Sequence, residues 1–415
     1  MKVYFKTFGC RTNLFDTQVM RENIKNFVVT ENEDEADIVV VNSCTVTNGA
    51  DAGVRSYVNK IYRSGKKIYF TGCGVKTQGK QLFDKNLIFG SFGHTYKENI
   101  DKFLQESQRF FYEESSNANH IDKTLVSEFV GKVRAFIKVQ EGCDFACSYC
   151  IIPAVRGVAR SYMQDKVLQQ VEVLAQNGVS EIVLTGTNVG SYGKDLGSSI
   201  AKLIKEIAKI NGIKRIRVGS LEPSQIDEEF LELLESEFLE RHLHIALQHS
   251  SDQMLKIMNR HNRVKTDREL LEKIANKGFA IGTDFIVGHP GETDDVWNEA
   301  FLNLQALPLT HIHPFIYSVR DNTPSAKMKN TIHGDVAKAR LHQINDLIMQ
   351  KNLEFRKKMI GKELQVLVES GEGGIYNGLD QFFNRIKIKS QQYLKNNWIN
   401  LTTYEIGIKG NSAEI

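Results

Sequence analysis

The chain has 415 residues, of which 41% are hydrophobic and 25% are charged, with a formal net charge of +3. A chain of this length can hold two or three domains of about 100–200 residues, and its composition is ordinary for a globular protein. The charge is too mildly basic to argue for or against a nucleic-acid partner.

Membrane and secretory classes are not indicated either. No apolar run approaches the roughly 18 residues that a membrane helix needs. The first residues form a strand pattern without the apolar core of a signal peptide. We therefore expect a cytoplasmic protein without membrane contact.

Residues 1–115 alternate short apolar runs with helical patterns. Strands are predicted at 2–7, 36–41 and 67–71, and helices over 14–26 and 50–63. Such alternation predicts a small doubly wound parallel sheet.

Three of the six cysteines, Cys10, Cys44 and Cys73, each follow one of these predicted strands. Six cysteines in a long chain without a signal peptide favour metal or catalytic chemistry over disulfides. In open α/β sheets, ligands bind outside the carboxyl ends of the strands, so these three thiols should meet at one edge. A three-thiolate site is predicted there; the alternative is three ordinary buried cysteines.

Residues 116–131 are polar and weakly patterned, which indicates a linker. Beyond them, strands are predicted at 133–139, 181–184, 215–218, 243–247, 280–287 and 311–316, each followed by a helix. This repetition predicts a full or partial (β/α) barrel, whose site would lie at the carboxyl ends of the strands.

The loop after the first barrel strand contains Cys143, Cys147 and Cys150. A structural zinc site usually has four protein ligands, whereas three cysteines on a four-iron cluster leave one iron open for substrate. The spacing favours the cluster over a zinc site with a distant fourth ligand, or over three unrelated thiols.

Polar and glycine residues follow other barrel strands, among them Asn188, Glu222, Gln248 and Gly288. They can bind a ligand by hydrogen bonds or by close backbone approach, although such residues are also ordinary turn formers.

A helix predicted over 335–359 carries Lys351, Arg356, Lys357 and Lys358, either as a solvated face or as RNA contacts.

The last segment, 361–415, has β-forming runs between Gly and Asn turns, which predicts a small β-barrel of oligonucleotide-binding size. Its basic residues are matched by an equal number of acidic ones, so charge does not argue for RNA. Its candidate base-stacking groups are Tyr376, Phe382, Phe383 and Tyr393.

The cysteine loop after the first barrel strand resembles the signature of radical S-adenosylmethionine (SAM) enzymes. Within that superfamily the chain resembles the methylthiotransferases over essentially its whole length. The matching stretches include Gly9-Cys10-Arg11-Thr12-Asn13, Asn42-Ser43-Cys44-Thr45-Val46-Thr47, Gly72-Cys73, Gly142-Cys143, Ser220-Leu221-Glu222-Pro223 and Met258-Asn259-Arg260. The resemblance implies an N-terminal methylthiotransferase domain (1–115), a radical SAM core (130–358) and a TRAM-like RNA-binding domain (361–415).

The resemblance also implies two 4Fe-4S clusters and SAM as cofactors. Cys143, Cys147 and Cys150 would hold the cluster that cleaves SAM to a 5′-deoxyadenosyl radical. Cys10, Cys44 and Cys73 would hold an auxiliary cluster carrying the sulfur to be methylated and inserted. Tyr149, Asn188, Glu222 and Gly288 are the expected SAM contacts.

The stretch Cys44-Thr45-Val46-Thr47 most resembles the branch acting on N6-threonylcarbamoyladenosine in the tRNA anticodon loop. An electron donor such as flavodoxin or ferredoxin, and a monomer, are expected. The alternatives within the family are the isopentenyladenosine branch and the branch acting on a ribosomal-protein aspartate. The alternatives outside it are a radical enzyme of different outcome, which would not need Cys10, Cys44 and Cys73 as ligands, and a zinc-stapled RNA-binding protein without catalysis. Departures from the family pattern include Tyr162, His249-Ser250 and His289.

Overall fold

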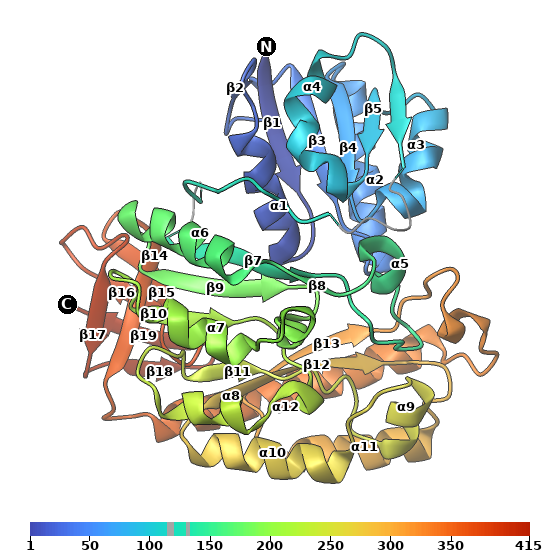
Figure 1. Ribbon diagram of the computed structural model, residues 1–415. Helices are drawn as coiled ribbons and strands as arrows, with labels where there is room; N and C mark the ends of the chain where they lie inside the picture. The colour runs from blue at the N-terminus through green and yellow to red at the C-terminus, as the bar shows by residue number, and fades with distance from the viewer. Residues whose placement is uncertain (114–119, 130–132) are drawn as a thin grey trace.

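The computed structural model describes residues 1–113, 120–129 and 133–415. Figure 1 shows an N-terminal α/β unit above a central α/β unit, with a small β-sheet beside the latter. The two α/β units and the curled C-terminal sheet confirm the predicted fold class.

The N-terminal unit is a parallel sheet with the strand order β2-β1-β3-β4-β5-β6. Its middle strand, Ile38–Ser43, is buried along its whole length, as its Ile-Val-Val-Val sequence predicts for a sheet covered on both faces. The elements are β1 (Lys2–Thr7), α1 (Arg11–Glu22), β2 (Val28–Val29), β3 (Ile38–Ser43), α2 (Asn48–Arg63), β4 (Lys67–Gly72), α3 (Lys80–Asp84), β5 (Gly90–Phe92), α4 (Ile100–Gln105) and β6 (Phe110–Tyr112).

The central unit contains the six predicted parallel strands, arranged as an open barrel. Strands β7, β9 and β10 form one sheet and β11, β12 and β13 another. The two sheets are joined by the bridges Ile216–Leu239 and Leu221–Ile245. Short β8 pairs antiparallel to β7. The strands are β7 (Ala135–Glu141), β8 (Arg160–Ser161), β9 (Glu181–Gly186), β10 (Arg215–Val218), β11 (His242–His244), β12 (Ala280–Val287) and β13 (His311–Ile316).

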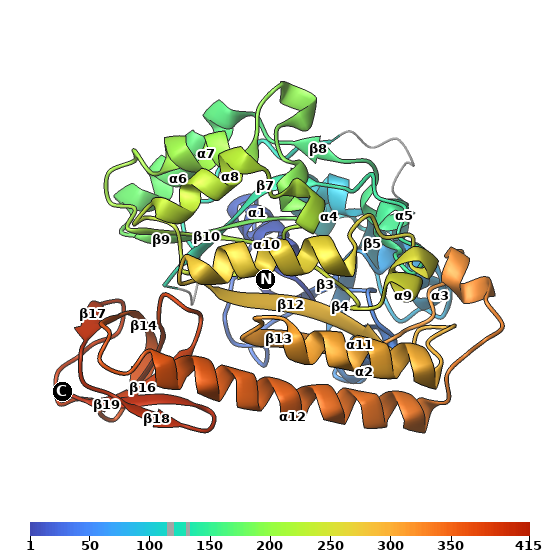
Figure 2. The same cartoon turned by 90° about the horizontal axis from the view of Figure 1, so that it is seen from below.

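Helices cover the outside of this barrel, and the long α12 runs from it to the C-terminal sheet (Figure 2). The helices are α5 (Ile152–Arg156), α6 (Gln164–Gln176), α7 (Ile200–Ile207), α8 (Glu228–Glu232), α9 (Asp252–Ile257), α10 (Val264–Asn276), α11 (Asp294–Ala306) and α12 (Gly334–Lys358). None of the helices in the described ranges is both long and apolar enough to cross a membrane.

The two α/β units share a hydrophobic core. Phe15 and Val19 of α1 pack in the same buried cluster as Val126, Phe129 and the barrel strands. Of the predicted linker, 116–119 and 130–131 lie outside the described residues. The described part of the linker, 120–129, packs against both units through Val126 and Phe129.

The C-terminal unit is a curled sheet with the strand order β17-β14-β15-β16-β19-β18. Its strand pairings within the described residues are antiparallel except that of β16 with β19. Its strands are β14 (Leu364–Glu372), β15 (Ile375–Leu379), β16 (Arg385–Lys389), β17 (Trp398–Leu401), β18 (Glu405–Gly407) and β19 (Gly410–Glu414).

Two of the candidate stacking groups are structural instead. Tyr376 and Phe382 are 6% and 7% exposed and belong to the core of this sheet, whereas Tyr393 is 72% exposed. Arg356 of α12 is also structural, because its guanidinium is buried and donates to the carbonyl oxygens of Gly407 and Ile408. The predictions of base stacking and RNA contact are thus wrong for these three buried residues.

Candidate functional site

A cavity of about 350 Å³ lies between the N-terminal unit and the mouth of the barrel, and all six cysteines border it. Three come from the loop after β7 and three from the ends of β1, β3 and β4. The carboxyl ends of parallel strands share one edge in each unit, and residues from both edges border this one cavity.

The loop that carries Cys143, Cys147 and Cys150 is held by backbone contacts. Gly142 has φ +76°, and a Cβ there would lie 1.9 Å from the carbonyl oxygen of Val158. Only glycine fits this close approach. The amide of Cys143 donates to the Gly157 oxygen at 3.0 Å, and that of Cys150 donates to the Cys147 oxygen at 3.1 Å.

Side-chain N–H groups point at two of these sulfurs. Asn188 Nδ2 lies 3.8 Å from Cys143 Sγ, and Arg260 Nη1 lies 3.5 Å from Cys147 Sγ. Burial raises the pKa of Cys143, and it raises that of Cys150 to about 12. Buried thiols of this kind lose their proton when a metal ion balances the negative charge of the thiolate, and N–H groups that donate to the sulfur also stabilise the thiolate.

The second set is arranged in the same way. Cys10 precedes α1 as its N-cap residue, while Cys44 and Cys73 are buried. Arg156 Nε donates to Cys73 Sγ at 3.2 Å. Burial raises the pKa of Cys73 to about 12, and the Arg156 charge opposes that rise. A Cβ on Gly9 would lie 2.7 Å from Cys44 Sγ, so glycine is needed for this thiol to approach the chain.

Three of the four expected SAM contacts border the cysteine cavity: Tyr149, Asn188 and Glu222. Gly288 is not among the residues around it. Its amide donates to Glu292 Oε2 at 2.6 Å, and a Cβ on it would lie 2.7 Å from the Cβ of Ala337 on α12. The structure thus gives Gly288 a packing position rather than a cavity position.

Arg260 borders the same cavity, but sequence reasoning did not select it as a site residue. Its guanidinium binds the two carboxylate oxygens of Glu222, at 2.8 Å for Nη1, and also reaches Cys147. The sequence did mark Arg260, because it lies in the motif Met258-Asn259-Arg260. Its role became apparent only from the structure, which places Glu222 beside it.

Comparison with known proteins identifies the family. Residues 137–302 match the radical SAM superfamily, and residues 2–91 match a family described as uncharacterized protein family UPF0004. A protein of Helicobacter pylori strain J99, named "Putative methylthiotransferase", is 61% identical over 99% of this chain and 99% of its own length. The chain belongs to the radical SAM methylthiotransferases.

More distant relatives of this methylthiotransferase have named substrates. A threonylcarbamoyladenosine tRNA methylthiotransferase MtaB of Aquifex aeolicus is 35% identical, with 89% of this chain and 93% of the relative covered. A tRNA-2-methylthio-N(6)-dimethylallyladenosine synthase of Fervidobacterium nodosum is 32% identical, with 92% and 91% covered.

Solved structures resemble this methylthiotransferase in fold alone. The radical SAM methyltransferase TsrM of Kitasatospora setae, solved with cobalamin and a 4Fe-4S cluster, has a TM-score of 0.59 at 16% identity, covering 78% of this chain and 77% of TsrM. Radical SAM enzymes use SAM and a 4Fe-4S cluster, so the kinds of cofactor expected from the sequence are confirmed.

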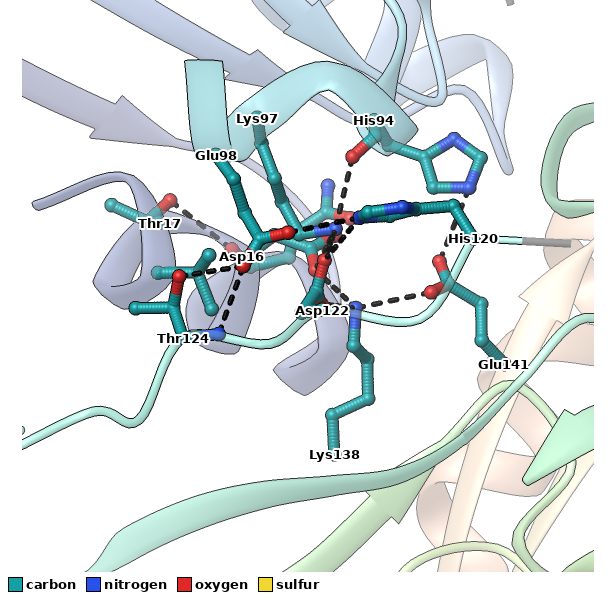
Figure 3. Close-up of polar contacts among 12 residues, drawn as sticks. Asp16, Thr17, His94, Lys97, Glu98, His120, Asp122, Thr124, Lys138 and Glu141 are labelled. Carbon is teal, nitrogen blue, oxygen red and sulfur yellow. Dashed lines mark hydrogen bonds and ion pairs between the residues drawn. The ribbon is translucent and has the colours of Figure 1, made fainter. Parts of the chain in front are cut away.

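A buried ionic network joins the two halves of this methylthiotransferase (Figure 3). Lys138 of β7 lies 2.6 Å from Asp16 of α1, 2.8 Å from Asp122 and 3.1 Å from Glu141. Burial opposes the charge of Lys138, but the carboxylates of Asp122, Asp16 and Glu141 raise its pKa well above the ordinary value. The three carboxylates therefore fix α1, residues 120–129 and β7 against one another.

The network continues to the cysteine cavity through Arg156. Its Nη1 lies 2.8 Å from Asp16 Oδ2 and 2.5 Å from Glu141 Oε1, while its Nε reaches Cys73. The guanidinium thus links the second cysteine set to the contact between the two units.

Proposed function

We propose that this enzyme transfers a methylthio group to carbon 2 of N6-threonylcarbamoyladenosine next to the anticodon of tRNA, using SAM and two 4Fe-4S clusters. The observation that carries the proposal is the placement of two three-cysteine sets around one cavity. The six cysteines are free thiols, as cluster ligands must be.

The two sets fit one cluster each. Cys143, Cys147 and Cys150 would hold the first cluster, and Cys10, Cys44 and Cys73 would hold the second. Three thiolates on a four-iron cluster leave one iron open, and the N–H groups of Asn188, Arg260 and Arg156 face the sulfurs of both sets. When bound, the first cluster supplies the electron that cleaves SAM, and the second offers an open iron for the transferred sulfur.

The residues around the cavity bind and orient. Tyr149 and Asn188 form wall positions beside the first set, where SAM would bind. The carboxylate of Glu222 would accept from the amino group of SAM, while Arg260 holds that carboxylate in place from its other side. Arg156 fixes Cys73 relative to α1, so that both sets keep their separation.

The choice of substrate rests on relatives and on one local resemblance. Relatives named for threonylcarbamoyladenosine and for dimethylallyladenosine are both similar to the chain, at 35% and 32% identity. The stretch 44–47 favours the former. Thr47 caps α2, and Thr45 binds Asp51, so this stretch places Cys44 at the cavity.

We further propose the domain division 1–115, 130–358 and 361–415, a monomeric enzyme, and a flavodoxin or ferredoxin as electron donor.

The anticodon loop suits the cavity because its unpaired base can be turned out of the stack.

Anaerobic reconstitution tests the two cysteine sets. About eight irons per chain are expected, and about four should remain when either set is replaced by alanine. Zinc alone, or four irons unaffected by replacing Cys10, Cys44 and Cys73, would contradict the proposal.

Mass spectrometry of nucleosides from a deletion strain tests the substrate. The 2-methylthio derivative of N6-threonylcarbamoyladenosine should disappear and return with a plasmid copy. Loss of the dimethylallyl derivative instead would assign the enzyme to that branch.

A further inference from the structure

A second chamber, of about 330 Å³, adjoins the cysteine cavity. Cys10, Thr12, Gly186, Ser220 and Asp284 border both. The chamber is walled by all three units: by the start of α1, by the barrel strands β9 to β13, and by Phe383 of the C-terminal sheet. A molecule reacting at the cysteines can extend into it.

The carboxylates of this chamber already have nitrogen partners within contact distance. Glu240 forms an ion pair with Arg217. Asp284 lies 3.2 Å from His244 Nε2 and 3.7 Å from His313 Nδ1. Both carboxylates therefore lie against side chains other than Arg11.

Arg11 borders this chamber as a cation without an ion-pair partner among the described residues. Within residues 1–113, 120–129 and 133–415, its side chain makes no hydrogen bond or ion pair, and its guanidinium carbon lies 5.8 Å from the centre of the Phe136 ring. A neighbouring carboxylate, Glu181, is taken by Arg134, Arg215 and Arg217. A guanidinium stays charged at neutral pH, and a half-buried one without an anion is costly.

We propose that Arg11 binds the carboxylate of the threonylcarbamoyl group, and so selects this nucleoside over those with a neutral N6 substituent. The inference rests on the proposed function. Arg11 directly follows Cys10, so its guanidinium lies beside the reacting site and not in it. The planar fork of a guanidinium matches a carboxylate with two parallel hydrogen bonds.

The same geometry disfavours neutral substituents. A dimethylallyl group in this chamber would cover the guanidinium without supplying an anion, and a buried cation left unpaired opposes binding. An RNA phosphate is the other anionic candidate, and the experiment separates the two.

The test compares three anticodon stem-loop RNAs on anaerobically reconstituted enzyme. Their adenosine carries threonylcarbamoyl, its neutral methyl ester, or no substituent. The wild type should show kcat/KM about 10- to 100-fold higher for the acid than for the ester, the range of a charge-assisted hydrogen bond. Fluorescence anisotropy should show the same preference in Kd.

Arg11→Gln should lose this preference to within about threefold, because the acid loses its cationic partner and the neutral ester no longer covers an unpaired cation. Arg21→Gln is the matched control, because Arg21 lies on the same helix and pairs with the exposed Glu31. Iron content and the paramagnetic spectra should match the wild type in both variants. If Arg11→Gln loads clusters poorly, Arg11→Lys should retain part of the preference.

Equal wild-type turnover of acid and ester would overturn the role of Arg11 and leave the proposed function standing. Equal loss of affinity for all three RNAs in Arg11→Gln would indicate a phosphate contact and overturn it as well. A wild type with intact clusters that methylthiolates neither modified RNA would refute the proposed function, and the inference with it.

Discussion

Replacing Lys138 by methionine should weaken the contact between the N-terminal unit and the barrel more than any exposed ion pair could. The ammonium of Lys138 is fully buried and lies within 3.1 Å of Asp16, Asp122 and Glu141. Methionine keeps most of the volume but leaves these carboxylates with too little positive charge. Removing one partner of a buried pair costs about 3–5 kcal/mol.

Hydrogen exchange measured by mass spectrometry reads this cost locally. Each 1.4 kcal/mol multiplies the open population about tenfold, so amides of α1 and of residues 120–129 should exchange about a hundredfold to a few thousandfold faster. Amides of α10 and α11, which lie on the far side of the barrel in Figure 1, should change little.

Two further variants of the same protein make this test decisive. Lys205→Met removes an exposed pair with Glu232 and should change stability by less than about 1 kcal/mol. Adding Asp122→Asn to Lys138→Met removes one of the carboxylate charges that Lys138 balances, and should restore part of the protection. If Lys138→Met exchanges like Lys205→Met, the network does not hold the two units together.

Three more changes probe other parts of the molecule. Gly142→Ala should halve the iron content by displacing the first cysteine set. The φ of Gly142 is +76°, and the added Cβ would lie 1.9 Å from the carbonyl oxygen of Val158. Full iron loading of this variant would contradict the prediction. Hydrogen bonds to Asp122 and Glu98 raise the pKa of His120 to about 9, above its ordinary 6.5. After a discount for solvent screening, protonated His120 should add about 1–2 kcal/mol to the free energy of unfolding. This contribution is complete below pH 6.5 and is lost as the pH rises through 9. His120→Gln should flatten that dependence in urea unfolding. Arg356→Gln should destabilise the C-terminal sheet by about 2–3 kcal/mol, whereas Lys357→Gln should not; equal effects would refute the structural role of Arg356.

Sequence could place the cysteines because topology alone carries that information. Strand periodicity located β1, β3 and β4, and parallel strands must end at one edge, which brings Cys10, Cys44 and Cys73 together. The position of the 143–150 loop followed from the same rule applied to the barrel.

What sequence could not supply is which distant side chains meet. Gly288 and Gly142 both have positive φ and both follow barrel strands, yet one packs on α12 and the other holds the cysteine loop. Arg260 and Glu222 are 38 residues apart and make their pair only once the barrel is formed. Buried charges such as Lys138 resemble surface charges until the chain is folded.

The position of α1 affects how the protein is synthesised. Its apolar side chains Phe15 and Val19 are buried by barrel strands that leave the ribosome more than a hundred residues later. At a translation rate of about 5–20 residues per second, the barrel strands that bury this helix are synthesised about 5–25 s after it. During that time its apolar face is exposed to chaperones and to other nascent chains. Residues 1–113 produced alone would keep that face exposed.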